Sequence, residues 1–177
     1  MTWRRGFSIA SLIGALLLVA GAASAEEHQH PAPKPGSAEF ERLKGLVGVW
    51  EGTTSEADHQ TVRAEYTLTS GGSALVETLF AGTPHEMVSV YYDRGGSLAM
   101  THYCMLGNRP ELVLRKVEGN RLELDLADGS GINPQETHMH SLALDLIDAD
   151  HLTQTWTAFE GGQPMKSSTV IHFSRVR

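Results

Sequence analysis

Three histidines have spacings that could bring them together in one binding site. His138 and His140 are two residues apart, and residues two apart in a β-strand leave the same face of the sheet. Leu142, Leu144 and Leu146 continue the same alternation. Since a run of leucines on one face is typical of the buried side of a strand, both imidazoles are predicted to point inward.

His102 lies in a second segment of the same kind. Leu98, Met100 and Cys104 stand at even spacing from it, so the face that carries His102 is also predicted to be buried. We therefore expect all three histidines to point into one interior from two different strands.

These three histidines could have one of three roles. Three imidazoles can hold a divalent metal and leave a fourth position for water, which would give a metal-dependent enzyme with His102, His138 and His140 as ligands. A single imidazole, that of His102 or His138, could instead be the axial ligand of a haem. The histidines could also hydrogen-bond to one another and to Tyr103 or Glu77, because a buried polar group without a partner costs about 1–3 kcal/mol. The spacing leaves these alternatives open.

Three further side chains complete the predicted interior. Cys104 would be a nucleophile only with an exposed thiol of lowered pKa, and its place beside His102 suits packing, so no catalytic residue is predicted. Glu77 lies in an apolar segment, either face of which could be buried, and Trp156 is expected as core or as an aromatic cavity wall. The predicted ligand-binding residues are Glu77, His102, Tyr103, Cys104, His138, His140 and Trp156.

The elements that position these residues are predicted to be β-strands. An apolar period of two runs through most of the chain, and turn residues such as Ser70-Gly71-Gly72 separate the periodic segments. About ten strands with short links and no helix between them predict an all-β, antiparallel up-and-down barrel. Asp128–Glu136, the longest connection, is expected at a rim. The predicted strands are Val49–Thr54, Gln60–Thr69, Ser73–Phe80, Glu86–Tyr92, Ser97–Cys104, Glu111–Val117, Arg121–Ala127, Thr137–Ile147, His151–Ala158 and Ser167–Arg175.

The N-terminal region has the features of an export signal. Arg4 and Arg5 precede an apolar run over Ile9–Ala20, and Ala23-Ser24-Ala25 has the small-x-small form of a cleavage site. The run is shorter than the roughly 20 residues that a membrane span needs. We therefore predict a signal peptide over residues 1–25 and a periplasmic or secreted protein without a stable membrane anchor; general secretion and twin-arginine export both remain open.

The remainder of the chain divides into a linker and one domain. Residues 26–37 are rich in proline and lack apolar periodicity, which predicts an extended linker. Ser37 is placed to cap a short helix over Ala38–Leu46, which opens the barrel domain of residues 38–177.

Composition excludes several classes of protein. The single cysteine rules out an internal disulfide. The net charge of −7 and the absence of any basic run make nucleic acid a poor partner. A small apolar molecule is the expected partner, and the oligomeric state is not indicated.

The motif Gly48-Val49-Trp50, directly after the predicted helix and ahead of about ten strands, resembles the opening of the calycins, which include lipocalins, fatty-acid-binding proteins and nitrobindin-like haem barrels. The resemblance implies that Trp50 closes one end of the barrel and that Arg175 or Arg177 packs across its indole. Segments such as Thr101–Cys104, Gly107–Pro110 and His138–His140 are similar to uncharacterised bacterial exported domains with a lipocalin-like barrel. The strand count exceeds eight, so nitrobindin-like closure is the nearer analogue.

The function expected from these features is binding of a small, largely apolar ligand, with haem as one possibility, inside an exported barrel without catalysis. The cofactor is left open between haem, a divalent metal and none. The alternatives are a metal-dependent enzyme that uses His102, His138 and His140, and an envelope interaction protein with a filled core whose loops do the work.

Overall fold

The computed structural model describes Met1, residues 34–55 and residues 59–177. The chain divides into two units, Met1–Pro31 and Ala32–Arg177, and the fold is that of the second. The predicted signal peptide and most of the predicted linker lie outside the described residues. Within the described part of the chain, no helix has the length and apolar character that crossing a membrane requires.

The predicted short helix is confirmed. It consists of α1 (Ala38–Leu43) and a 3₁₀ turn, η1 (Lys44–Leu46). The Ser37 hydroxyl accepts a hydrogen bond of 3.3 Å from the Phe40 amide, which caps the first turn. Phe40 and Leu43 are buried against the barrel.

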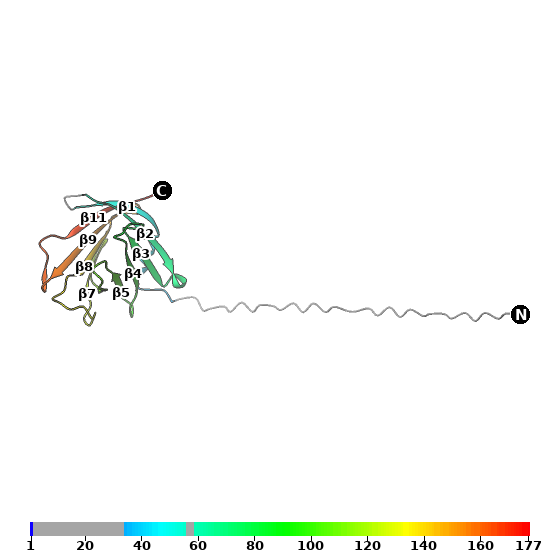
Figure 1. The fold of residues 1–177 in the computed structure, drawn as a ribbon, viewed down its shortest axis with the longest axis horizontal. Helices are drawn as coiled ribbons and strands as arrows, with labels where there is room; N and C mark the ends of the chain where they lie inside the picture. Colours follow the sequence, from blue (N-terminus) through cyan, green and yellow to red (C-terminus); the bar gives the residue numbers. More distant parts are fainter. Residues whose placement is uncertain (2–33, 56–58) are drawn as a thin grey trace. The chain divides into compact units, whose positions relative to one another are not determined.

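Ten antiparallel strands close into one barrel, as the alternation predicted (Figure 1). Strands β1 to β9 pair in chain order, and β11 lies between β9 and β1 and closes the ring. The short strand β10 extends the edge of β9. The strands are β1 (Gly48–Thr54), β2 (Thr61–Thr69), β3 (Ala74–Leu79), β4 (Met87–Asp93), β5 (Leu98–Tyr103), β6 (Glu111–Glu118), β7 (Arg121–Leu126), β8 (His138–Leu146), β9 (His151–Glu160), β10 (Gln163–Pro164) and β11 (Thr169–Arg175), with a 3₁₀ turn, η2 (Ser70–Gly72), between β2 and β3.

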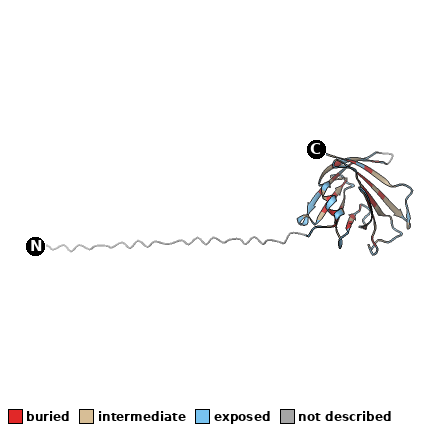
Figure 2. Ribbon diagram, turned by 180° about the vertical axis from the view of Figure 1, so that it is seen from behind, coloured by how far each residue is buried: buried red, intermediate tan, exposed pale blue. Residues whose placement is uncertain are grey.

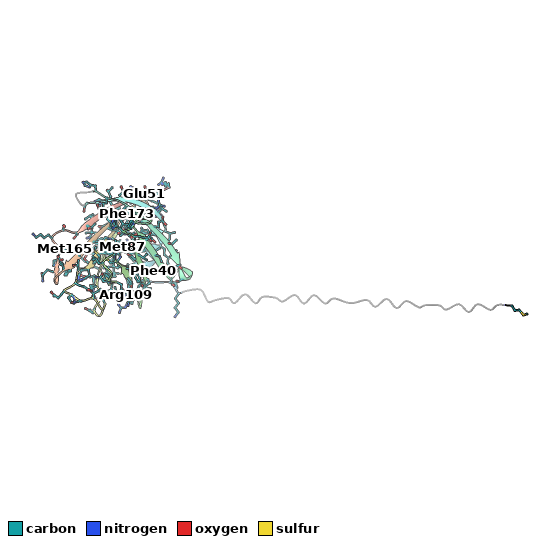
Figure 3. All side chains as sticks on the ribbon, in the orientation of Figure 1. Phe40, Glu51, Met87, Arg109, Met165 and Phe173 are labelled. Atoms are coloured by element: carbon teal, nitrogen blue, oxygen red, sulfur yellow. The ribbon has the colours of Figure 1, made fainter. Side chains whose placement is uncertain are left out.

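The core fills the barrel interior. Buried and less buried residues alternate along the strands (Figure 2), for example the pattern of alternate burial over β3. Met87 and Phe173 are buried, whereas Glu51 and Met165 are exposed (Figure 3). A period of two in the sequence therefore corresponds to inward and outward faces in the fold.

One end of the barrel is closed around Trp50. Its side chain is fully buried, and the indole Nε1 donates a hydrogen bond of 2.7 Å to the Leu46 carbonyl in η1. The Arg175 guanidinium lies 4.2 Å from the centroid of the Trp50 ring, which confirms the cation–π contact expected for one of two arginines. The same guanidinium donates to the carbonyls of Gly45 and Val47. These contacts tie the helical segment, β1 and β11 together.

Candidate functional site

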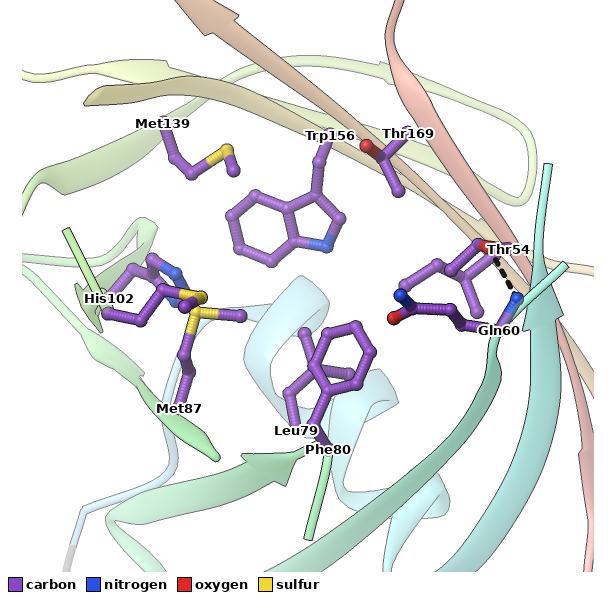
Figure 4. A pocket seen from close by; sticks show the side chains of 11 residues that line it. Thr54, Gln60, Leu79, Phe80, Met87, His102, Met139, Trp156 and Thr169 are labelled. Atoms are coloured by element: carbon purple, nitrogen blue, oxygen red, sulfur yellow. Dashed lines mark hydrogen bonds between the residues drawn. The ribbon is translucent and has the colours of Figure 1, made fainter. Parts of the chain in front are cut away.

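A cavity of about 200 Å³ lies at the end of the barrel away from Trp50. Thr54 ends β1, Leu79 ends β3 and Met87 begins β4, and the ends of antiparallel neighbours meet on one side. Figure 4 shows the lining side chains around a common space. Most of them are apolar or aromatic; the full set is Thr54, Gln60, Leu79, Phe80, Met87, His102, Met105, Met139, Trp156, Thr169 and Ile171.

His102 on β5 is the one imidazole in the cavity wall. The side chain is 1 % exposed, and its Nδ1 lies 3.0 Å from the Ser89 hydroxyl on β4. Its ring packs against that of Trp156, with 4.8 Å between centroids. The Nε2 atom is buried and has no hydrogen-bond partner in the described part of the chain. Burial lowers the pKa of His102 to about 4, so the imidazole is neutral at pH 7.

A buried carboxylate lies behind His102. The sequence left open whether Glu77 points into the barrel or out of it. In the structure its side chain is fully buried. It accepts hydrogen bonds from the Tyr66 hydroxyl at 2.8 Å, the Tyr91 hydroxyl at 2.9 Å and Gln154 Nε2 at 2.5 Å. The Ser89 hydroxyl is a further partner. Burial raises the pKa of Glu77, and these donors oppose that rise.

The network connects the carboxylate to the cavity wall on two sides. Ser89 bridges Glu77 to His102, and Gln154 accepts a hydrogen bond of 2.8 Å from Trp156 Nε1. Sequence reasoning missed Ser89 and Gln154. Each lies two residues from buried apolar neighbours in its strand. The same alternation that predicted an inward His102 could therefore have predicted that Ser89 and Gln154 point inward.

The sequence predicted that His102, His138 and His140 share one interior, but the structure does not bring the three side chains into one cavity. The register of β8 with β9 shifts between Met139 and Ser141, so a β-bulge interrupts the period of two. Met139, not His138 or His140, lines the cavity with His102. In the described part of the chain, no group of three or more His, Cys, Asp or Glu residues is arranged to hold a metal ion. The three-histidine metal site is therefore not assembled.

His138 and His140 form a separate chain of hydrogen bonds. His138 Nδ1 lies 2.7 Å from the Glu136 carbonyl, and its Nε2 lies 3.0 Å from His140 Nδ1. His140 Nε2 lies 3.2 Å from Asp125, and the His140 ring stacks on Phe159 with 3.6 Å between centroids. Burial lowers the pKa of His140, and Asp125 opposes this. These partners account for both imidazoles structurally.

Two other predicted site residues are not in the cavity wall. Tyr103 is exposed and lies in a separate shallow depression with Arg109 and Ser130, because it occupies the opposite face of β5 from His102. Cys104 is inward, as predicted, and its Sγ lies 4.0 Å from Met87 Sδ. Burial raises the pKa of this thiol, so it remains protonated and a poor nucleophile. Trp156 does form the predicted aromatic wall.

The buried imidazole predicts how stability depends on pH. His102 titrates at 6.5 when exposed and at about 4 in the fold, so the unfolded chain binds more protons between these values. Its contribution to stability is therefore complete above pH 6.5 and is lost as the pH falls to 4, by about 3 kcal/mol. Urea unfolding of the wild type and of His102→Phe at pH 7 and pH 4 measures this difference.

The raised pKa of Glu77 has the opposite effect on how stability depends on pH. Glu77 is present in both the wild type and His102→Phe, so the difference between these two proteins reports on His102. His85→Phe, at an exposed position, is the matched control and should keep the wild-type pH dependence. An equal loss of stability in His102→Phe and the wild type would contradict the prediction.

The fold and the site define a closed antiparallel β-barrel with a small apolar cavity at one end. No protein-family model and no curated protein sequence matches the chain. Among solved structures, the chain is similar to Rv2717c from M. tuberculosis, with a TM-score of 0.55 and 16 % identity, over 81 % of this chain and 100 % of that one. A likeness at this identity concerns the fold alone.

Proposed function

We propose that this protein is an exported, calycin-like barrel that binds a small, largely apolar molecule in the cavity beside His102, without catalysis. The observation that carries the proposal is a buried imidazole nitrogen that has no hydrogen-bond partner among the described residues and belongs to a mostly apolar wall. Burial of apolar ligand surface, at about 25 cal/mol per Å², would supply the affinity. A few polar groups in an apolar pocket are typical of sites that orient a ligand.

The volume of the cavity favours a ligand smaller than a haem. The His102 imidazole has the chemistry of an axial ligand. However, the volume of about 200 Å³ is below the roughly 300–1,000 Å³ that accommodates drug-sized ligands, and a haem is larger than most of these. The volume therefore favours a single small ring or a short aliphatic molecule.

The polar residues near the cavity lack the arrangement of a hydrolase. Ser89, His102 and Glu77 are the residue types of a catalytic triad, but Glu77 contacts Ser89 and not the second imidazole nitrogen. Ser89 is fully buried and is absent from the cavity wall. A substrate in the cavity would not reach its hydroxyl, so a binding role is favoured over acyl transfer.

Toluene is a suitable probe for this proposal. Titration of the purified full chain by calorimetry should show binding of one toluene per chain. Met139→Trp fills the cavity and should weaken binding at least about tenfold, which corresponds to 1.4 kcal/mol. Met165→Trp, at an exposed methionine that does not line the cavity, should leave the affinity unchanged.

The absence of toluene binding in the wild type would contradict the proposal and favour the interaction protein with a filled core. Equal loss of binding in Met139→Trp and Met165→Trp would mean that toluene binds elsewhere. A Soret band or stoichiometric metal in purified wild-type protein would favour the haem or metal alternative.

A further inference from the structure

We propose that the cavity selects small neutral aromatic molecules that carry one hydrogen-bond donor, with phenol as the simplest example, and that His102 Nε2 accepts this hydrogen bond. The inference rests on the proposed function and specifies the chemistry of its ligand. It follows from an inventory of the protons in the network behind His102.

Each of the four partners of Glu77 has a hydrogen that it can donate to the carboxylate. A carboxylate offers about four lone-pair positions. Tyr66, Tyr91, Gln154 and Ser89 supply four donors to it. The Tyr66 oxygen itself accepts a hydrogen bond from Gln154 at 2.7 Å, so its own proton is available to the carboxylate. We assign Glu77 the ionised form, in which it accepts from all four partners.

The proton of Ser89 fixes the tautomer of His102. A hydroxyl has one proton, and we assign that of Ser89 to Glu77, to which Ser89 is a side-chain hydrogen-bond partner. Its oxygen, 3.0 Å from His102 Nδ1, must then accept from Nδ1–H. Since the neutral imidazole carries one N–H, Nε2 is left as an acceptor. This is the atom that lacks a partner in the described part of the chain, so a ligand that satisfies it must be a donor.

The walls around His102 suit an aromatic ring. The indole of Trp156 offers a face for stacking, and it lies beside His102 on one side of the cavity (Figure 4). Met87, Met105 and Met139 line the same space, and thioethers make favourable contacts with aromatic edges. The Nε2 atom is shielded from water. Methionine side chains have the rotational freedom to uncover it.

No described residue of the wall is a cation, which disfavours an anionic ligand. The described lining residues carry no charge at pH 7, and this includes His102. A phenolate or carboxylate would be desolvated there without a counter-charge, which is costly. A ligand with one donor and an apolar ring satisfies both Nε2 and the remaining wall.

The test compares phenol, anisole and toluene by calorimetry at pH 7, with wild type and His102→Phe. In His102→Phe, phenol binding should weaken about tenfold or more, because its hydroxyl is buried without an acceptor. Toluene and anisole binding should change less than about threefold. His85→Phe is the matched control and should leave all three affinities unchanged.

A second measurement uses the wild type and therefore does not require that His102→Phe folds. Long-range proton–nitrogen spectra of the wild type distinguish the two neutral tautomers of His102, and we expect Nδ1–H. Phenol, but not toluene, should shift the Nε2 resonance. An Nε2–H tautomer would overturn the inference, and a preference for anisole would then be expected.

The outcomes separate the two proposals. If toluene binds but phenol is insensitive to His102→Phe, the donor requirement is wrong and the apolar binding site stands. If none of the three molecules binds, the proposed function fails, and the inference fails with it.

Discussion

Replacement of Glu77 by leucine is expected to lower the free energy of unfolding by about 3–5 kcal/mol. The substitution removes an acceptor that Tyr66, Tyr91 and Gln154 share. The Tyr66 and Tyr91 hydroxyls then remain buried without this acceptor, at about 1–3 kcal/mol per group, whereas Gln154 keeps its contact with Tyr66. Urea unfolding monitored by fluorescence measures the change. Glu51→Leu, at an exposed position on β1, should change stability by less than about 0.5 kcal/mol.

A rescue experiment distinguishes lost hydrogen bonds from a poor fit of leucine. When both partners of a buried hydrogen bond are replaced by apolar groups, the cost is small. Tyr66→Phe and Tyr91→Phe introduced together should therefore destabilise the wild type but restore part of the stability of Glu77→Leu. A double-mutant cycle gives the coupling free energy. Strict additivity would show that the two tyrosines and the carboxylate act independently, contrary to the structure.

In the proposed binding mode, this network fixes the orientation and the tautomer of His102. Ser89 contacts the imidazole on one side and the carboxylate on the other. Buried polar networks of this kind are favourable only when all members have partners. Within this one, the described residues leave one atom, His102 Nε2, without a partner. The exception lies where a ligand could supply the missing contact.

The alternation of apolar and polar residues predicted which side chains of a strand point inward. It placed His102, Cys104 and Trp156 on inward faces, and all three are buried. It also predicted ten strands and their order around the barrel, because short links join neighbouring antiparallel strands. These properties depend on side chains a few residues apart, which the sequence displays directly.

The bulge in β8 could not be predicted in the same way. His138-Met139-His140 contains no glycine or proline to mark an interruption, and both histidines keep even spacing with Leu142. The interruption is set by pairing with β9, where Ser141 lies opposite Thr157. One extra residue reverses the face of everything that precedes it. For this reason His138 and His140 do not line the cavity with His102.

Contacts between strands that are far apart in the chain could not be predicted from the sequence either. Glu77 and Gln154 meet across the barrel interior, although 77 positions separate them. The periodicity indicates that each is inward, but it does not indicate the height of each along the barrel. That height depends on the register of every intervening pair. The volume of the cavity depends in turn on how all of these side chains pack.

Replacement of Trp50 by alanine is expected to destabilise the barrel by about 3–5 kcal/mol while the cavity keeps its affinity for toluene. Trp50 is fully buried at the end of the barrel that the helical segment closes. No lining residue of the cavity belongs to that end. The affinity of the folded fraction, measured by calorimetry below the unfolding temperature, should therefore stay within about twofold of wild type.

Arg175→Met keeps the prediction testable if Trp50→Ala does not fold. It retains an apolar stem beside the indole but removes the cation–π contact and the hydrogen bonds to Gly45 and Val47. We expect a loss of about 2 kcal/mol, again with unchanged toluene affinity. Arg177→Met is the matched control; this exposed arginine forms only an ion pair with Asp150 in the described structure, and such pairs contribute about 0–1 kcal/mol. Weakened toluene binding in Arg175→Met, to the extent seen in Met139→Trp, would contradict the separation of the closed end from the binding end.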